Sequence, residues 1–187
     1  CELFEASINE QTQQLLNGIT ELGIFSVPIE HQDNFEVLFR RDEELTAVFH
    51  KDSVFLEDGQ KSVTLKDLED VPLSLSSGCS EIVLKAFAQK SMVPRITCTS
   101  TTRSTTLEWT RVKAAVSIVP VEEGEDLGEE FVARPITDIS ADVYKTVVKV
   151  KDRPLSVAAQ HFLKFYSKTR NSQQVCDLDA ILKSSNL

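Results

Sequence analysis

Short apolar runs alternate with amphipathic stretches of helical period along the chain. The apolar runs are rich in β-branched and aromatic residues and end at prolines or polar turns, which predicts strands. We expect strands at residues 1–5, 21–28, 35–41, 45–52, 71–75, 95–99, 114–120, 131–136 and 143–152. We expect helices at residues 7–17, 62–68, 76–90, 107–113 and 177–183, and another that begins at Ser156. This alternation predicts an α/β protein with parallel sheets.

The first predicted helix carries signals at both ends. Ser7 and Glu10 have the spacing of a capping box, in which each side chain accepts a hydrogen bond from a free backbone amide. Gly18 is placed to end the helix, because glycine readily adopts the positive φ found after many helices. With a strand on either side, this helix is expected to form a βαβ unit.

Two strand-like segments one hundred positions apart share four residues in register. TAVFHKD at 46–52 and TVVKVKD at 146–152 have threonine, valine, lysine and aspartate at matching places. Each is apolar over several residues and then stops at Lys-Asp, as a strand does where it enters a polar turn. The sequence between them is long enough for a small domain, and the outer parts are long enough for a second.

The charge balance argues against a nucleic-acid-binding surface on this chain. Among 187 residues there are 29 acids and 20 bases, and the bases are scattered. A net charge of −9 repels a phosphate backbone unless the bases cluster. No apolar run approaches the roughly 20 residues that cross a bilayer, and no targeting segment is visible. We therefore expect a cytoplasmic protein that does not bind membranes.

The cysteines and acids do not form a metal-binding pattern. The four cysteines lie far apart, at Cys1, Cys79, Cys98 and Cys176. They form no CxxC pair and have no histidine at ligand spacing, so we predict no metal and no other cofactor. We expect reduced thiols, with two disulfides as the alternative, because a core of this size needs no covalent staple. The acidic stretch 122–130 is interpreted as a solvated loop, with a metal site as the alternative.

Recognisable catalytic patterns are also missing from the sequence. No serine sits in a G-x-S-x-G turn, and no glycine-rich phosphate loop follows a strand. We therefore expect a protein that is not an enzyme, and catalysis on a similar scaffold stays open as an alternative class.

Two strand-to-helix turns are rich in hydroxyl groups. Open α/β sheets bind ligands beyond the carboxyl ends of their strands, where helix N-termini present free amides. Hydroxyl groups beside such amides suit a carboxylate or a polar metabolite, although capping of the helices would explain them equally well. The predicted ligand-binding residues are Ser76, Ser77, Gly78, Ser80, Thr99, Ser100, Thr101, Thr102 and Arg103 from these turns, and Phe25, Ser26 and Pro28 from an earlier strand end.

Three stretches resemble the effector-binding domain of LysR-type transcriptional regulators. LFEASINEQTQQLLNGITELGIFSVP resembles an early strand, helix and strand of that family, and TTLEWTRVKAAVSIVP resembles a later helix and strand. The most specific stretch is RPITDISADVYKTVVKVKDRPLSVAAQHFLKFY, in which residues 151–156 fall in register with the family pattern. Lys113 and Ala115 stand where the family usually has glycines. Because lysine disfavours a positive φ, we expect a different backbone at Lys113.

The resemblance implies a two-lobed fold of the type II periplasmic-binding-protein kind. Each lobe would be a sheet flanked by helices, and two crossover strands would join them. Regulatory subdomain I is expected at 1–48 plus 149–187, with its first strand and helix upstream of Cys1, and regulatory subdomain II at 49–148. The two recurring segments would be the crossovers and should lie side by side. The implied hinge residues are Val48, Phe49, His50, Val148, Lys149 and Val150.

The resemblance also implies a function in bacterial transcription regulation. A small-molecule effector, polar or anionic, would bind between the lobes and control DNA binding through an N-terminal winged helix-turn-helix that is missing here. The implied partners are this effector and further copies of the chain, as a dimer of this domain and a tetramer of the full-length protein. DNA would be bound only through the missing domain. The alternative is a solute-binding protein of a transporter with the same fold.

Overall fold

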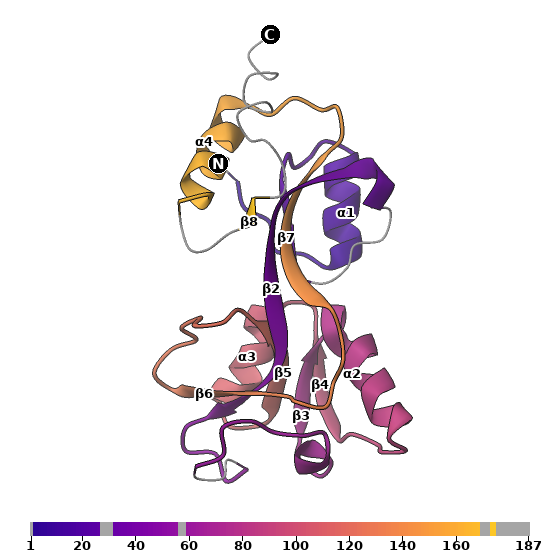
Figure 1. The fold of residues 1–187 in the computed structure, drawn as a ribbon, viewed down its shortest axis with the longest axis vertical. Helices are drawn as coiled ribbons and strands as arrows, with labels where there is room; N and C mark the ends of the chain where they lie inside the picture. Colours follow the sequence, from indigo (N-terminus) through magenta and orange to yellow (C-terminus); the bar gives the residue numbers. More distant parts are fainter. Residues whose placement is uncertain (1, 27–31, 56–58, 169–172, 175–187) are drawn as a thin grey trace. The chain divides into compact units, whose positions relative to one another are not determined.

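The chain folds as two compact units, shown in Figure 1 by a computed structural model that describes residues 2–26, 32–55, 59–168 and 173–174. Unit 1 combines Cys1–Asp42 with Tyr144–Leu187, and unit 2 is Glu43–Val143. The predicted boundaries between the subdomains, after residue 48 and before residue 149, each lie a few residues later in the sequence than the boundaries between these units. The assignment of the two units to regulatory subdomains stays a prediction.

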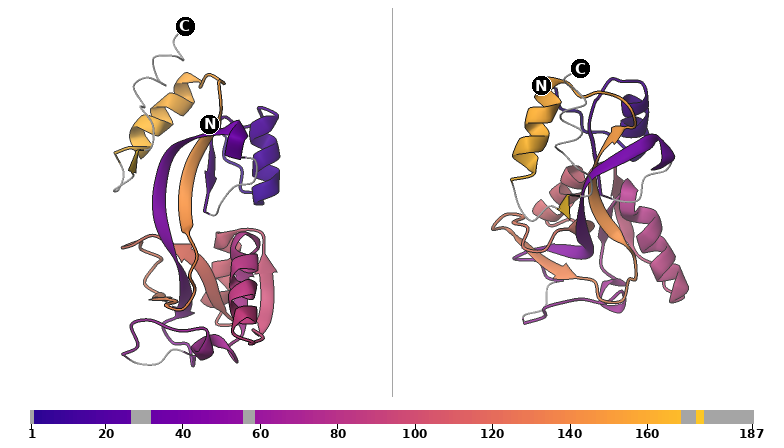
Figure 2. Two further views of the ribbon diagram at one scale, coloured as in Figure 1. Left: turned by 45° about the vertical axis from the view of Figure 1, so that its right-hand side comes forward. Right: turned by 45° about the horizontal axis from the view of Figure 1, so that its top comes forward.

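In the described part of unit 1, a layer of strands has a helix on each face (Figures 1 and 2). Strand β1 (Gly23–Phe25) pairs antiparallel with β7 (Val143–Val150), and β7 neighbours β2 (Phe35–His50), which pairs antiparallel with β8 (Gln173–Gln174). A short 3₁₀ helix, η1 (Gln32–Asn34), precedes β2. On one face Val147 packs in a cluster with Leu163 of helix α4 (Val157–Tyr166). On the other face Val148 packs with Leu15 of helix α1 (Ile8–Leu16).

Unit 2 is a mixed sheet with one helix on each face. Strand β3 (Leu73–Ser76) lies between β4 (Ile96–Ser100) and β5 (Val116–Val121) and is parallel to both. Strand β5 pairs antiparallel with β2, whose other edge carries β6 (Phe131–Pro135). Helix α2 (Ser77–Gln89) packs Phe87 in a cluster with Ile118, whereas helix α3 (Arg103–Arg111) packs Leu107 against Val119. Two neighbouring residues of β5, Ile118 and Val119, therefore pack against helices on opposite faces of the sheet.

Local helix signals are confirmed. The backbone N–H of Ser7 donates to the Glu10 carboxylate at 2.9 Å, and the N–H of Glu10 donates to Ser7 Oγ at 3.3 Å. Gly18 follows helix α1 with a φ of 72°. Ser156 precedes α4, and its Oγ accepts the N–H of Ala159. None of the helices in the described part of the chain is long and apolar enough to cross a membrane.

Several predicted elements differ from the observed ones. The predicted strand at 1–5 is wrong for residues 2–5, which are irregular, and Leu3 is 94% exposed. An alternating segment becomes a strand when one of its faces is buried, and this segment buries neither face. The predicted helix at 62–68 is reduced to the 3₁₀ helix η2 (Lys66–Leu68), because Val63 forms a bridge with Ile136 instead. Residues 177–183 lie outside the described residues.

The two recurring segments do not lie side by side, so that prediction is wrong. In unit 2, residues 46–48 have both edges occupied, by β5 and by β6. In unit 1, residues 146–148 pair with β1, and farther along the N–H of Lys151 donates to Asn34 O at 3.0 Å. The predicted strands at 35–41 and 45–52 form one continuous strand, β2, which ends at His50, and residues 51–52 are a turn. The end of β7 therefore lies next to the beginning of β2. The hinge roles of residues 48–50 and 148–150 stay predictions.

Lys113 keeps the backbone that a glycine would adopt. Its φ is 62°, its N–H donates to Thr110 O, and the N–H of Ala114 donates to Trp109 O. These bonds close the C-terminus of α3 as a left-handed cap. The expectation of a different backbone at Lys113 is therefore wrong, because the bonds that end the helix outweigh the local preference of lysine.

Replacing Lys113 with glycine should stabilise the protein relative to replacing it with alanine. Both substitutions remove the contact of Lys113 Nζ with Asp52 Oδ2, at 2.9 Å, so the comparison isolates the backbone. A side chain in the left-handed region costs about 1 kcal/mol, which Lys113→Gly relieves and Lys113→Ala does not. Urea unfolding at neutral pH measures the difference. Equal free energies of unfolding for the two variants would contradict this account of the cap.

Candidate functional site

Two hydroxyl-rich turns meet at one edge of the unit 2 sheet. Strands β3 and β4 are parallel and pair Ser76 with Ser100, so both strands end at the same edge. The helices that follow, α2 and α3, begin there. Ser77 Oγ donates to the Thr101 carbonyl oxygen at 3.3 Å, which joins the two turns directly. The structure therefore brings together the two sets of residues that the sequence singled out.

The turn before α2 has a helix start without a side-chain cap. Ser76 is the N-cap residue, but its Oγ lies 3.1 Å from Cys79 Sγ and makes no capping bond. Ser77 is exposed, Gly78 is half-buried, and Ser80 Oγ donates to Ser77 O at 3.0 Å. Burial raises the pKa of the Cys79 thiol, and this outweighs its hydrogen bonds with Ser76. A raised pKa favours the thiol of Cys79 over the reactive thiolate.

The turn before α3 divides its hydroxyl groups between capping and exposure. Thr102 caps the helix, because its Oγ1 accepts the N–H of Thr105 at 3.3 Å. Ser100 is buried, with its Oγ 3.5 Å from Cys98 Sγ. Thr99 and Thr101 are exposed. Capping therefore accounts for Thr102, while Thr101 and Ser77 present polar groups at the sheet edge.

A third turn reaches the same edge, and the sequence interpretation missed it. Strand β5 is parallel to β3 and ends at Val121, directly before the acidic stretch 122–130. Arg103 Nη2 lies 3.1 Å from Glu125 Oε1, and Arg103 Nη1 donates to Glu125 Oε2 at 3.3 Å. The side chains are 23% and 17% exposed, so this is a half-buried, two-point ion pair. The signal was an acidic turn directly after a buried strand of the parallel sheet.

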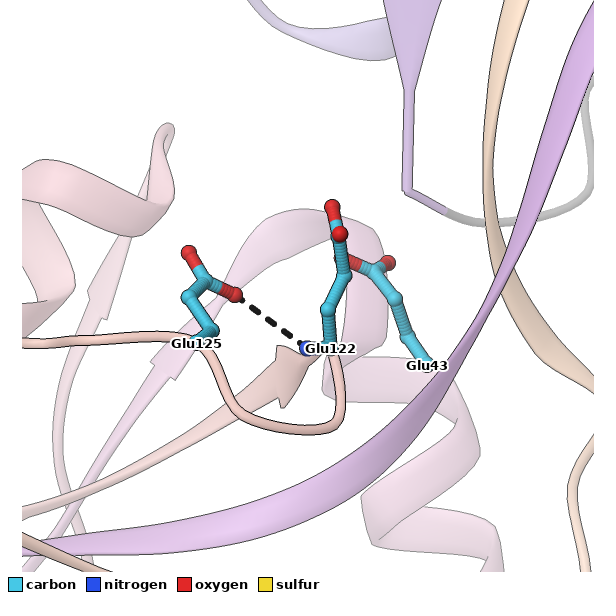
Figure 3. A group of neighbouring side chains, drawn as sticks. All are labelled: Glu43, Glu122 and Glu125. Carbon is cyan, nitrogen blue, oxygen red and sulfur yellow. Dashed lines mark hydrogen bonds between the residues drawn. The ribbon is translucent and has the colours of Figure 1, made fainter. Parts of the chain in front are cut away.

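The acidic stretch is therefore not simply a solvated loop. Figure 3 shows the carboxylate of Glu43 lying near that of Glu122, beside Glu125, whose Oε2 accepts the N–H of Glu122 at 3.2 Å. One carboxylate oxygen from each of these residues lies within 4.8 Å of the others. Oxygen atoms at this spacing could hold a hard cation such as Ca²⁺. Glu125, however, already has the Arg103 guanidinium as its counterion.

A cavity of about 530 Å³ lies in unit 2 and shares Glu43 with this acidic group. The cavity is lined by residues 43–45 of β2 and by residues 135–137 and 139–142. Leu45 and Ile136 supply apolar surface, while Glu44 and Asp142 are acidic. None of the predicted ligand-binding residues is among its lining residues, so the cavity does not coincide with the hydroxyl-rich edge.

Two of the three predicted ligand-binding residues of unit 1 lie in the described part of the chain, and neither side chain is exposed. The side chain of Phe25 is 2% exposed and packs in a cluster with Leu15. Ser26 follows β1 and is half-buried, and Pro28 lies outside the described residues. The burial of Phe25 favours a structural role for its side chain.

The chain is similar to one family of proteins over most of its length. A family model described as the LysR substrate binding domain matches residues 1–170. No curated protein matches the chain. Among solved structures, the effector binding domain of QuiR in complex with shikimate is 20% identical, with a TM-score of 0.69, covering 91% of this chain and 83% of that chain.

Two further structures show the same likeness of fold. The BenM effector binding domain with its effector benzoate is 20% identical, with a TM-score of 0.61, and the match covers 91% of this chain and 81% of that chain. Full-length CbnR complexed with target DNA is 23% identical, with a TM-score of 0.63, over 81% of this chain and 54% of that chain. The chain therefore spans about half the length of that full-length regulator.

Proposed function

Because this chain belongs to the family of LysR substrate-binding domains, with their type II periplasmic-binding-like fold, we propose that it is the effector-sensing part of a bacterial transcription regulator. A small polar molecule binds at the edge where β3 and β4 end. The molecule binds one conformation of the protein more tightly than another. Its binding therefore shifts the balance between the two conformations.

The observation that carries this proposal is the meeting of the two hydroxyl-rich turns. Ser76 pairs with Ser100 across parallel strands, and Ser77 contacts Thr101. The start of α2 without a side-chain cap supports ligand binding there, because helix N-termini attract the oxygen atoms of ligands. A transporter's solute-binding protein, the alternative with the same fold, is not favoured, because the matching family and the cited neighbours are regulators.

The proposal extends to partners that this chain alone does not include. DNA is bound by a separate winged helix-turn-helix domain of the full-length regulator, and copies of the chain associate, as a dimer of this domain and a tetramer of the full-length protein. The CbnR neighbour, a full-length regulator complexed with its target DNA, supports the DNA-binding part of this proposal by analogy. Because the QuiR and BenM neighbours are bound to shikimate and benzoate, a binding screen on this chain should include these carboxylates together with neutral hydroxylated molecules.

Removing the hydroxyl groups at the edge should weaken effector binding about tenfold. In the double variant Ser77→Ala with Thr101→Val, the loss of one or two hydrogen bonds to a polar ligand accounts for a change of this size. A thermal-shift screen of metabolites identifies ligands of the wild-type protein, and calorimetry then compares their dissociation constants.

Ser53→Ala provides the matched control, because Ser53 is a serine of the same unit that lies outside these turns. It should leave the dissociation constant unchanged. Ligand binding that is equally strong in the double variant and the wild type would place the effector elsewhere, and a folded full-length protein that binds nothing in a broad library would contradict effector sensing altogether.

A further inference from the structure

We propose that Glu125 determines the charge of the effector: by holding Arg103, it makes the edge select neutral hydroxylated molecules over carboxylates. This inference rests on the proposed function and concerns the same site. Arg103 is the one predicted ligand-binding residue with a positive charge, and it opens helix α3 directly after the β4 turn.

The geometry shows what already occupies the Arg103 guanidinium. Both terminal nitrogens contact the Glu125 carboxylate, at 3.1 and 3.3 Å, in the fork arrangement that arginine uses to bind carboxylate ligands. Glu125 is held in turn by the N–H of Glu122 at 3.2 Å. The chain thus supplies its own carboxylate where an anionic ligand would bind.

The topology sets this pair beside the hydroxyl groups. Arg103 follows β4 and Glu125 follows β5, which are the strands on either side of β3. The ion pair therefore joins the turns that flank the start of α2, where Ser77 is exposed. A ligand that binds Ser77 and Thr101 meets a neutralised arginine.

The negative charge around Glu125 also disfavours a carboxylate ligand. Glu43 and Glu122 place further carboxylates within 4.8 Å of Glu125 (Figure 3). A carboxylate ligand must either displace Glu125 into this acidic neighbourhood or bind without the arginine. A neutral ligand with hydroxyl or amide groups needs neither, and its hydrogen bonds to the turns are unaffected by the ion pair.

The test compares a carboxylate with its neutral amide on matched variants. The probes are 4-hydroxybenzoate and 4-hydroxybenzamide, measured by calorimetry at neutral pH and low salt, where screening is weak. Glu125→Gln keeps an oxygen that can accept the N–H of Glu122 but removes the charge. Glu123→Gln removes the same charge from an exposed neighbour and is the control.

We expect the carboxylate to gain about tenfold in affinity relative to the amide in Glu125→Gln, the size of one charge-assisted hydrogen bond. Glu123→Gln should leave this ratio unchanged. Adding Arg103→Gln to Glu125→Gln should abolish the gain, because the arginine provides it. Circular dichroism and urea unfolding establish that each variant is folded.

An unchanged ratio in Glu125→Gln, or no measurable binding of the carboxylate to that variant, overturns the role of Glu125. These outcomes leave the proposed function standing if the wild-type protein binds other molecules of the metabolite screen through Ser77 and Thr101. If neither the wild type nor Glu125→Gln binds any molecule of the screen, the proposed function fails as well.

Discussion

Replacing Glu36 with alanine should destabilise the protein by about 3 kcal/mol at neutral pH, because it leaves a buried ammonium group without its carboxylate. Lys149 Nζ lies 3.0 Å from Glu36 Oε2, and the side chain of Lys149 is only 8% exposed. Its other contacts are the carbonyl oxygens of Val150 and Arg153, each at 3.3 Å. These neutral acceptors do not offset the cost of burying the charge. Because Glu36 is 34% exposed, the loss should fall at the lower end of the range for buried pairs.

Urea unfolding measures this loss, and two further variants make the result specific. Glu44→Ala removes an exposed glutamate from the same strand and should change stability by less than about 0.5 kcal/mol. Glu36→Gln combined with Lys149→Met removes both charges and should recover most of the stability, because no buried charge remains. If the double variant is no more stable than Glu36→Ala, charge burial is not the cause.

Replacing Arg153 with alanine should cost about 2 kcal/mol, through the end of helix α1. Arg153 Nη1 donates to Leu15 O at 2.6 Å, and Nη2 donates to Leu16 O at 3.1 Å. These carbonyls belong to the last turn of α1, where a helix leaves carbonyl groups without partners from its own ladder. Leu15 O also accepts the N–H of Gly18 at 3.1 Å, so the arginine adds to the bonds that close the helix. A cation at this end also interacts favourably with the helix dipole. The arginine therefore ties the turn after β7 to a helix more than one hundred residues earlier.

Hydrogen exchange and urea unfolding test this role together. The amides of α1 should exchange faster in Arg153→Ala, beyond the change in global stability. Arg153→Lys keeps the charge but lacks the fork and should recover less than half of the loss. Lys151→Ala removes an exposed cation from the same turn and should have little effect. Unchanged protection of α1 in Arg153→Ala would show that these hydrogen bonds do not stabilise the helix.

Features set by neighbouring residues were predicted well from the sequence. Ser7 and Glu10 interact three residues apart, and Ser156 caps the helix that it immediately precedes. The turns at residues 76–80 and 99–103 were placed by a general rule for parallel sheets, and the structure brings them together. Each of these predictions needed only short-range chemistry or the direction of neighbouring strands.

Features set by distant residues were missed. Glu125 lies 22 residues from Arg103, and only the position of β5 in the sheet brings the two together. The length of β2 was also missed, because the acidic residues 42–44 in its middle look like a turn. The structure continues the strand through them, since β5 pairs with Glu44 and the residues that follow. Strand pairing with distant parts of the chain thus determined both the length of β2 and the contact between Arg103 and Glu125, which the local sequence pattern does not specify.

The division of the chain has a consequence for the order of folding during synthesis. Unit 2 is one uninterrupted stretch, whereas unit 1 joins residues from both ends of the chain. Strand β1 pairs through Gly23 with Val148, so its partner leaves the ribosome only after all of unit 2 has been made. Domains generally fold as soon as their residues are available, and closing a long loop carries an entropic cost. Strand β1 is therefore synthesised well before the strand with which it pairs.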